Sequence, residues 1–377
     1  MESVGQMNFK DKLSDAYQGK TVLITGHTGF KGGWLALWLH SIGAKIVGYS
    51  LDPPTNPSFF HETELKNLIT NIHGNISERE KLIEVVKKFH PDFIFHLAAQ
   101  PLVRDSYKNP WDTFNVNVMG TVNVLEAIRL CRHPTICVCI TSDKCYENRE
   151  WIYAYRENDS LGGYDPYSAS KGAAEIAIAS YRKSFFKPDE KAPISAISSA
   201  RAGNIIGGGD WAANRIVPDC IRCLIKNEPI RIRNPEAVRP WQFVLDPLSG
   251  YLLLALRMKE NPLIYADAWN FGPHYSSNIT VREIAEKVIG KWGSGKWEIA
   301  LDEENPVHEA GYLKLDIAKA MTKLEWKPVY GIDRTIQKTV EWYKQKNSGN
   351  RNMIETSLDQ INEYTDCAEK IYNSDRI

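Results

Sequence analysis

A glycine-rich segment between a short apolar run and a helix-like stretch places the strongest constraint on the fold. The run at residues 20–25 reads K-T-V-L-I-T and leads into G-H-T-G-F-K-G at residues 26–32. Residues 33–42 then carry apolar side chains at helical spacing. In a strand–turn–helix unit, glycines let the backbone approach a pyrophosphate, whose charge lies at the positive end of the helix. The segment therefore predicts a dinucleotide-binding unit with parallel strands.

The residues expected to hold the cofactor follow the ends of three predicted strands. A simple turn is the alternative for the pair Asn75 and Ile76. After the second strand at 45–49, Asp52 lies slightly late for a ribose contact, and no arginine stands there for a 2′-phosphate. This pattern favours NAD over NADP. The predicted cofactor-binding residues are Gly26, Thr28, Gly29, Phe30, Lys31, Gly32, Asn75, Ile76, Ala98, Ala99 and Gln100.

The overall composition is that of an ordinary globular protein and excludes several classes of partner. The 377 residues include 46 Lys+Arg and 46 Asp+Glu, so no basic excess points to nucleic acid. No apolar run is long enough to span a membrane, and residues 1–20 lack a signal-peptide core. Seven cysteines without framework spacing fit a reducing cytoplasm. The lone C-x-x-C at 220–223 has no second pair, so we expect no metal site.

The order of strand-like and helix-like segments predicts an α/β fold with two parts. We expect a Rossmann-like doubly wound parallel sheet at residues 18–204, with later segments around 242–275 returning to it. Residues 205–346 break the strict alternation and are expected to form mainly a smaller C-terminal α/β substrate-binding domain. Residues 347–377 form a polar tail with some helical pattern and no assigned role.

Two clusters of polar residues are the candidates for chemistry. Ser142, Asp143 and Lys144 follow the buried strand at 135–141, and ligands of parallel sheets bind at the carboxyl ends of strands. Tyr167 and Lys171 are four residues apart, which puts them on one helical face. A lysine ammonium beside a phenol lowers the phenol pKa from about 10 toward neutrality. Such a phenol can exchange a proton with a sugar hydroxyl.

These motifs occur in one order along the chain: T-G-H-T-G-F-K-G, H-L-A-A-Q, T-S-D-K, Y-S-A-S-K and R-A-G-N. Together they resemble the extended short-chain dehydrogenases/reductases that modify nucleotide sugars, and they cover about residues 18 to 346. Within that family, the segments G-H-T-G-F-K-G-G-W-L and R-P-W-Q-F-V-L-D and the Asp143–Lys144 pair are most similar to CDP-glucose 4,6-dehydratases. The resemblance implies a lyase of deoxysugar (O-antigen type) biosynthesis with catalytic NAD and a CDP-sugar substrate.

The resemblance also implies a role for each candidate catalytic residue. Ser142 and Tyr167 would act on the sugar 4-hydroxyl, and Lys171 would hold the nicotinamide ribose and lower the tyrosine pKa. Asp143 would protonate the departing C6 hydroxyl. Lys144 replaces the glutamate that removes the C5 proton in the family. A lysine can act as that base only if its pKa falls well below about 10; otherwise it can polarise a water or stabilise the enolate.

The remaining expectations concern the substrate and the partner. For the diphosphate and nucleotide, the candidates are Arg201, Asn204, Arg215 and Arg239, with His308 and Glu309 near the ribose. Family members usually dimerise through two helices per subunit, here 111–132 and 167–186. The alternatives are a nucleotide-sugar 4-epimerase, a 4,6-dehydratase of another nucleotide-glucose, and an inactive dinucleotide sensor. Asp143 favours dehydration, because family epimerases usually lack an acid there.

Overall fold

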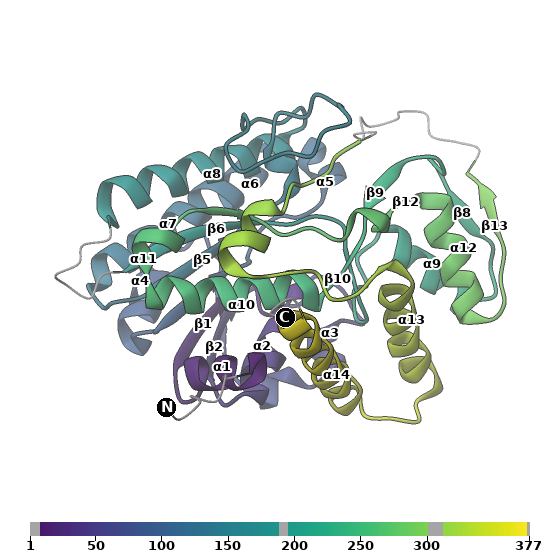
Figure 1. The fold of residues 1–377 in the computed structure, drawn as a ribbon, viewed down its shortest axis with the longest axis horizontal. Helices are drawn as coiled ribbons and strands as arrows, with labels where there is room; N and C mark the ends of the chain where they lie inside the picture. Colours follow the sequence, from purple (N-terminus) through teal and green to yellow (C-terminus); the bar gives the residue numbers. More distant parts are fainter. Residues whose placement is uncertain (1–7, 188–194, 301–311, 375–377) are drawn as a thin grey trace.

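A seven-stranded parallel sheet forms the centre of the part of the chain that the structure describes (Figure 1). The structure is a computed structural model that describes residues 8–187, 195–300 and 312–374. The strand order is β11-β6-β5-β4-β1-β2-β3. All strands are parallel, and the order in which the chain adds them to the sheet changes side between β1 and β4. This confirms the predicted doubly wound sheet. The strands are β1 Thr21–Thr25, β2 Lys45–Ser50, β3 Thr70–His73, β4 Phe93–His96, β5 Ile136–Ile140, β6 Ala196–Arg201 and β11 Ala268–Asn270.

Helices cover both faces of the sheet, because the strands carry apolar side chains on both sides. In β1, Val22 and Ile24 pack into one core and Leu23 packs into the other. The first core is covered by α1 Phe9–Tyr17, α2 Phe30–Ser41, α10 Leu245–Glu260 and α14 Met353–Ser374. The second is covered by α4 Arg79–Phe89, α7 Gly120–Cys131 and α8 Pro166–Phe185.

The long helix expected at 111–132 is divided by a π-helical turn. Helix α6 at Pro110–Phe114 leads into π-helical Asn115–Met119 and then α7. Asn117 lies within that turn, where its amide nitrogen donates to Gln100 O at 3.1 Å and to Ser170 Oγ at 2.8 Å. A side chain committed to neighbouring segments is a known cause of such local unwinding.

A smaller α/β part lies beside the carboxyl ends of the strands (Figure 1). It contains three two-stranded sheets, counted over the described residues: β7 Ile205–Ile206 with β10 Gln242–Phe243, β8 Ile230–Ile232 with β13 Trp297–Ile299, and β9 Val238–Pro240 with β12 Asn278–Thr280. Its helices are α9 Ile216–Ile225, α12 Val281–Trp292 and α13 Ile332–Ser348. The short helical segments elsewhere are Phe59–Glu62, Leu65–Asn67, Val103–Lys108, Asp143–Cys145, Pro262–Tyr265, Tyr275–Ser277 and Ala320–Leu324.

The C-terminal tail forms a helix that packs back onto the sheet domain. Helix α14 contacts α1, α2 and α13. Its Tyr364 hydroxyl donates to Asp246 Oδ1 at 2.9 Å, and the rings of Tyr372 and Phe9 lie 5.0 Å apart. The tail therefore completes the core on one face of the sheet. Among the described residues, none of the helices has the length and apolar character needed to cross a bilayer.

Candidate functional site

A cavity of about 820 Å³ lies between the carboxyl ends of the sheet strands and the smaller α/β part. Its walls come from segments far apart in sequence, including the start of α2, the segment after β5, the first turns of α8 and the start of α9. All five predicted catalytic residues line it: Ser142, Asp143, Lys144, Tyr167 and Lys171. The cavity is therefore the candidate active site.

The polar segment after β5 presents two groups to the cavity. Ser142 Oγ donates to Asp143 Oδ1 at 2.9 Å and accepts from Lys144 N at 3.2 Å. Asp143 is buried, and its Oδ2 has no hydrogen-bond partner among the described residues. That oxygen lies against Gly203, where a Cβ would approach it to 1.9 Å. An unsatisfied buried carboxylate oxygen in a cavity wall is available to a substrate group.

The start of α8 places Tyr167 and Lys171 in the cavity wall beside Ser142. Asp165 caps the helix by accepting from Ser168 N at 2.9 Å, and Pro166 occupies the first helical position. Lys171 Nζ lies 5.9 Å from the centre of the Tyr167 ring. Both side chains are buried in the cavity wall.

The expected effect of Lys171 on the tyrosine is wrong for the protein without ligands. Burial raises the pKa of Tyr167 to about 12, although the Ser142 hydroxyl acts in the lowering direction. Burial also lowers the pKa of Lys171 to about 8, against the raising effects of Cys145, Glu175 and Cys139. The sequence argument considered the charge of the lysine but not the desolvation of both groups.

The glycine loop leaves the first turn of α2 open for an anion. Gly26 has φ +79°, and a Cβ there would lie 2.7 Å from Ala98 N. Gly29 is the N-cap of α2 and contributes no side-chain hydrogen bond, so the first N–H groups lack a side-chain cap. Lys31 lines the cavity, and burial followed by the charges of Lys171 and Arg215 lowers its pKa to about 7. Phe30 and Ala99 line the cavity as well.

Several predicted cofactor residues have contacts within the chain instead of lining the cavity. Thr28 Oγ1 donates to Leu51 O at 2.9 Å. The Asn75 side chain accepts from Ser77 N at 2.9 Å, and Gln100 bonds to Thr113. Five further predicted cofactor residues do not line the cavity either: Gly26, Gly29, Gly32, Ile76 and Ala98. Their contacts with a cofactor stay predictions.

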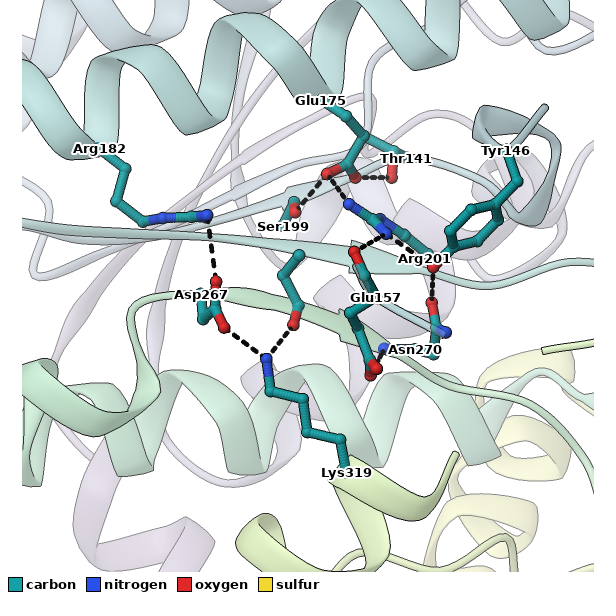
Figure 2. Close-up of polar contacts among 11 residues, drawn as sticks. Thr141, Tyr146, Glu157, Glu175, Arg182, Ser199, Arg201, Asp267, Asn270 and Lys319 are labelled. Carbon is teal, nitrogen blue, oxygen red and sulfur yellow. Dashed lines mark hydrogen bonds and ion pairs between the residues drawn. The ribbon is translucent and has the colours of Figure 1, made fainter. Parts of the chain in front are cut away.

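The candidate substrate residues divide into two groups. Asn204, Arg215 and Arg239 line the cavity. Arg215 Nη1 donates to Asp210 Oδ2 at 2.8 Å, which fixes its guanidinium at the wall. Arg201 does not line this cavity, which corrects the expectation that it binds the diphosphate. Its side chain is 3% exposed and its Nη2 donates to Glu175 Oε2 at 2.7 Å, so its charge is already paired (Figure 2).

Sequence reasoning missed three further arginines of the cavity wall, Arg104, Arg231 and Arg233. The alternation R-I-R at residues 231–233, which begins in β8 and continues one residue past it, was the available signal for the last two, because Ile232 is buried between the two arginines. It would have placed both guanidinium groups on one face of a short strand. His308 and Glu309 lie outside the described residues.

Comparisons with known proteins agree with this geometry. The family model described as GDP-mannose 4,6 dehydratase matches residues 23–339. The chain is 47% identical to the CDP-glucose 4,6-dehydratase of Salmonella typhimurium over 351 residues, which cover 92% of this chain and 97% of that protein.

Solved structures show the same fold at lower identity. An epimerase of Methanothermobacter thermautotrophicus superposes with a TM-score of 0.75 at 22% identity, covering 94% of this chain and 97% of that one. The dTDP-glucose 4,6-dehydratase of Bacillus anthracis, solved in complex with NAD, gives a TM-score of 0.70 at 21% identity and covers 88% and 98%.

Proposed function

The chain belongs to the GDP-mannose 4,6 dehydratase family, and from that premise we propose that it converts CDP-glucose into CDP-4-keto-6-deoxyglucose. The observation that carries this proposal is Asp143, whose buried Oδ2 has no hydrogen-bond partner among the described residues and which lines one cavity with Ser142, Tyr167 and Lys171. An alcohol oxidation needs the last three, whereas removal of a hydroxyl also needs an acid. The relative at 47% identity is named for this activity and supports CDP-glucose as substrate.

The glycine loop and its surroundings fit a dinucleotide, and we propose NAD. The uncapped N–H groups at the start of α2 suit a pyrophosphate, and Lys31 adds a cation beside them. Gly29 leaves space above the loop, because a Cβ there would meet only Gly26 O at 3.4 Å. When bound, NAD⁺ would supply a hydride acceptor for C4 and then the hydride donor for C6.

The residues of the cavity divide the proton transfers between them. Tyr167 takes the proton of the 4-hydroxyl, with Ser142 orienting that hydroxyl. The ketone at C4 acidifies C5–H; in this proposal a water polarised by Lys144 accepts the C5 proton, and the Lys144 ammonium stabilises the enolate that forms. Asp143 gives a proton to the departing C6 hydroxyl. Burial holds the pKa of Tyr167 at about 12, so the proposal requires that the Lys171 ammonium, 5.9 Å from the ring centre, stabilises the phenolate once substrate and NAD⁺ are bound.

The arginines of the smaller α/β part suit the nucleotide diphosphate. Residues 205–346 supply Arg215 and Arg239 to the cavity wall, and Asn204 lies at the junction with the sheet. We therefore infer that this region is the substrate-binding domain. The seven cysteines are all free in the structure, which is compatible with a reducing cytoplasm.

A homodimer through α6–α7 and α8 completes the proposal. These neighbouring helices expose large apolar side chains on the surface, where a monomer gains nothing from them. Trp111 is 74% exposed, Ile176 61% and Phe185 55%. A second copy would bury the same patch in a two-fold arrangement.

The product distinguishes the proposal from its alternatives. Incubation with CDP-glucose and NAD⁺ should give a 4-keto-6-deoxy sugar nucleotide, recognised by an ultraviolet band that develops in alkali and by the mass loss of one water. Formation of only the C4 epimer would overturn the proposal in favour of an epimerase. Parallel incubations with UDP-glucose and TDP-glucose test the nucleobase, and turnover of either in preference to CDP-glucose would correct the substrate.

A further inference from the structure

One buried carboxylate connects the helix of Tyr167 and Lys171 to the ends of two sheet strands. Glu175 lies on α8 one turn beyond Lys171, so both side chains leave the helix on the same side. Its Oε1 accepts from Thr141 Oγ1 at 2.5 Å, and its Oε2 accepts from Ser199 Oγ at 2.8 Å (Figure 2). Thr141 directly precedes Ser142. Glu175 therefore connects α8 with the strand end that carries Ser142.

The carboxylate is held in its charged form by a buried ion pair. Glu175 Oε2 lies 2.7 Å from Arg201 Nη2, and the two side chains are 2% and 3% exposed. Burial alone would raise the pKa of Glu175, but Arg201 and the hydrogen bonds keep it below the ordinary value. Arg201 Nη1 in turn donates to the Tyr146 hydroxyl at 2.6 Å and to Glu157 O at 3.0 Å.

Glu175 is the permanent negative charge that acts on Lys171. Burial raises the pKa of Cys145 far above neutrality, so that thiol carries no charge near pH 7. Burial likewise keeps His96 neutral, with a pKa of about 3. The titratable groups that interact with Lys171 come from α2, β4, β5, the segment after β5 and α8, and they are Lys31, His96, Cys139, Cys145, Tyr167 and Glu175.

We propose that Glu175 is a positioning residue for the oxidation step: it fixes α8 against the strand end that presents Ser142, and its charge keeps Lys171 protonated. The assignment rests on the proposed function only in naming C4 oxidation as that step. Without the carboxylate, Lys171 loses the charge that opposes its desolvation, so its proton is lost at lower pH. Activity that needs the charged lysine then declines earlier as the pH rises.

Two variants separate this role from a purely structural one. Glu175→Gln keeps the shape of the side chain but leaves Arg201 buried without its partner. The double variant Glu175→Gln/Arg201→Met removes both charges and restores a neutral interior. The matched control is Asp267→Asn. It removes a carboxylate that pairs with Arg182 and Lys319 but does not lie on α8. Asp267 lines a second, smaller cavity together with Glu175 and Arg201.

The first measurement is the titration of Lys171 itself, by trace acetylation at a series of pH values and mass spectrometry of the labelled peptide. We expect a midpoint near the wild-type pKa of about 8 for the control, and a midpoint lower by about one unit in both Glu175 variants. The second is the pH profile of kcat. At pH 8, a shift of that size leaves about fivefold less charged Lys171, so kcat falls by about that factor while KM stays within about twofold.

The outcomes distinguish this inference from the proposed function. If the double variant folds and both its Lys171 midpoint and its kcat profile match those of the wild type, the positioning role is wrong, although the dehydratase activity stands. If the wild type makes no dehydrated product but the Lys171 midpoint moves in the Glu175 variants, the proposed function fails and the effect on Lys171 is supported. A shifted midpoint in Asp267→Asn as well would overturn the specific role of Glu175.

Discussion

The position of the Asp143 carboxyl depends on Gly203, because the residue that faces it has no side chain. A Cβ on Gly203 would lie 1.9 Å from Asp143 Oδ2, so the carboxyl fits only against glycine. One carboxylate oxygen then accepts from Ser142, while the other is buried without a hydrogen-bond partner among the described residues. The acid is therefore in direct contact with Ser142, one of the groups that handle the 4-hydroxyl.

Asp143→Asn should separate oxidation from dehydration. The amide is nearly isosteric but cannot give up a proton, so we expect transient NADH to form while release of the dehydrated product slows by about 10²–10⁴-fold. Stopped-flow absorbance of NADH and the ultraviolet band of the product measure the two events. Tyr167→Phe is the matched comparison and should abolish both signals. Unchanged turnover in Asp143→Asn would show that another group is the acid.

The arginines show where residue-level prediction from sequence ends. Arg201 opens the R-A-G-N motif and Arg215 was chosen by its position alone, and both were candidates for binding a diphosphate. Only the structure shows that Arg201 meets Glu175, 26 positions earlier in sequence, whereas Arg215 pairs at the cavity edge with Asp210. The partner of a charge is set by tertiary packing, which local spacing does not contain. The desolvation of Tyr167 escaped prediction for the same reason.

At the scale of elements, α10 and α14 meet through a buried acid. Asp246, in the first turn of α10, accepts from Val329 N at 2.6 Å and from the Tyr364 hydroxyl at 2.9 Å. Burial raises its pKa to about 7, although these hydrogen bonds act in the lowering direction. The folded protein therefore keeps a proton on Asp246 between about pH 4 and this value, where an unfolded chain has lost it.

This proton makes stability fall as the pH rises through that range, and Asp246→Asn should remove the dependence. At pH 5 the folded wild type still carries the Asp246 proton, so this pH gives the reference difference in stability between wild type and variant. At pH 8 the variant should gain relative to that reference by about 1.4 kcal/mol for each pH unit between 5 and the folded pKa. Urea unfolding at the two pH values gives the difference. Asp333→Asn, at an exposed pair with Lys287, is the control, and an equal pH effect there would rule out Asp246 as its source.

Most elements were predictable because their periodicity is strong. The strand before the glycine loop and the helix after it both occur where apolar spacing placed them. The π-helical turn at Asn115–Met119 was not predictable, since it depends on side-chain bonds from Asn117 to distant segments. The sequence indicated some helical pattern in the tail. It did not predict the packing of the tail against α1, because that contact joins segments far apart in the sequence.

At the scale of the whole molecule, the exposed apolar patch on α6–α7 and α8 predicts a dimer. Replacing Trp111 and Ile176 with glutamate should convert the dimer into a folded monomer, because two charges per subunit would face their copies across a two-fold interface. Sedimentation velocity measures the mass, and circular dichroism checks the fold. The control pair is Leu263→Glu and Ile264→Glu, two exposed apolar residues on another helix. A wild-type protein that sediments as a monomer would contradict the prediction.

The α/β class and the doubly wound sheet followed from the order of elements, whereas the construction of the cavity did not. Its walls combine the ends of β5 and β6 with residues from α9 and β8, and no sequence pattern gives the angle between those parts. The catalytic cluster was foreseeable because strand ends of a parallel sheet share one edge. Of the three missed arginines, Arg231 and Arg233 belong to the wall that the smaller α/β part supplies.

The contact between α1 and α14 has a consequence for how the protein is made. The ribosome adds Tyr372 long after its ring partner Phe9. At ordinary elongation rates α1 waits on the order of tens of seconds for α14. The apolar face of α1 therefore stays uncovered until α14 has been synthesised, and this face of the sheet closes only then.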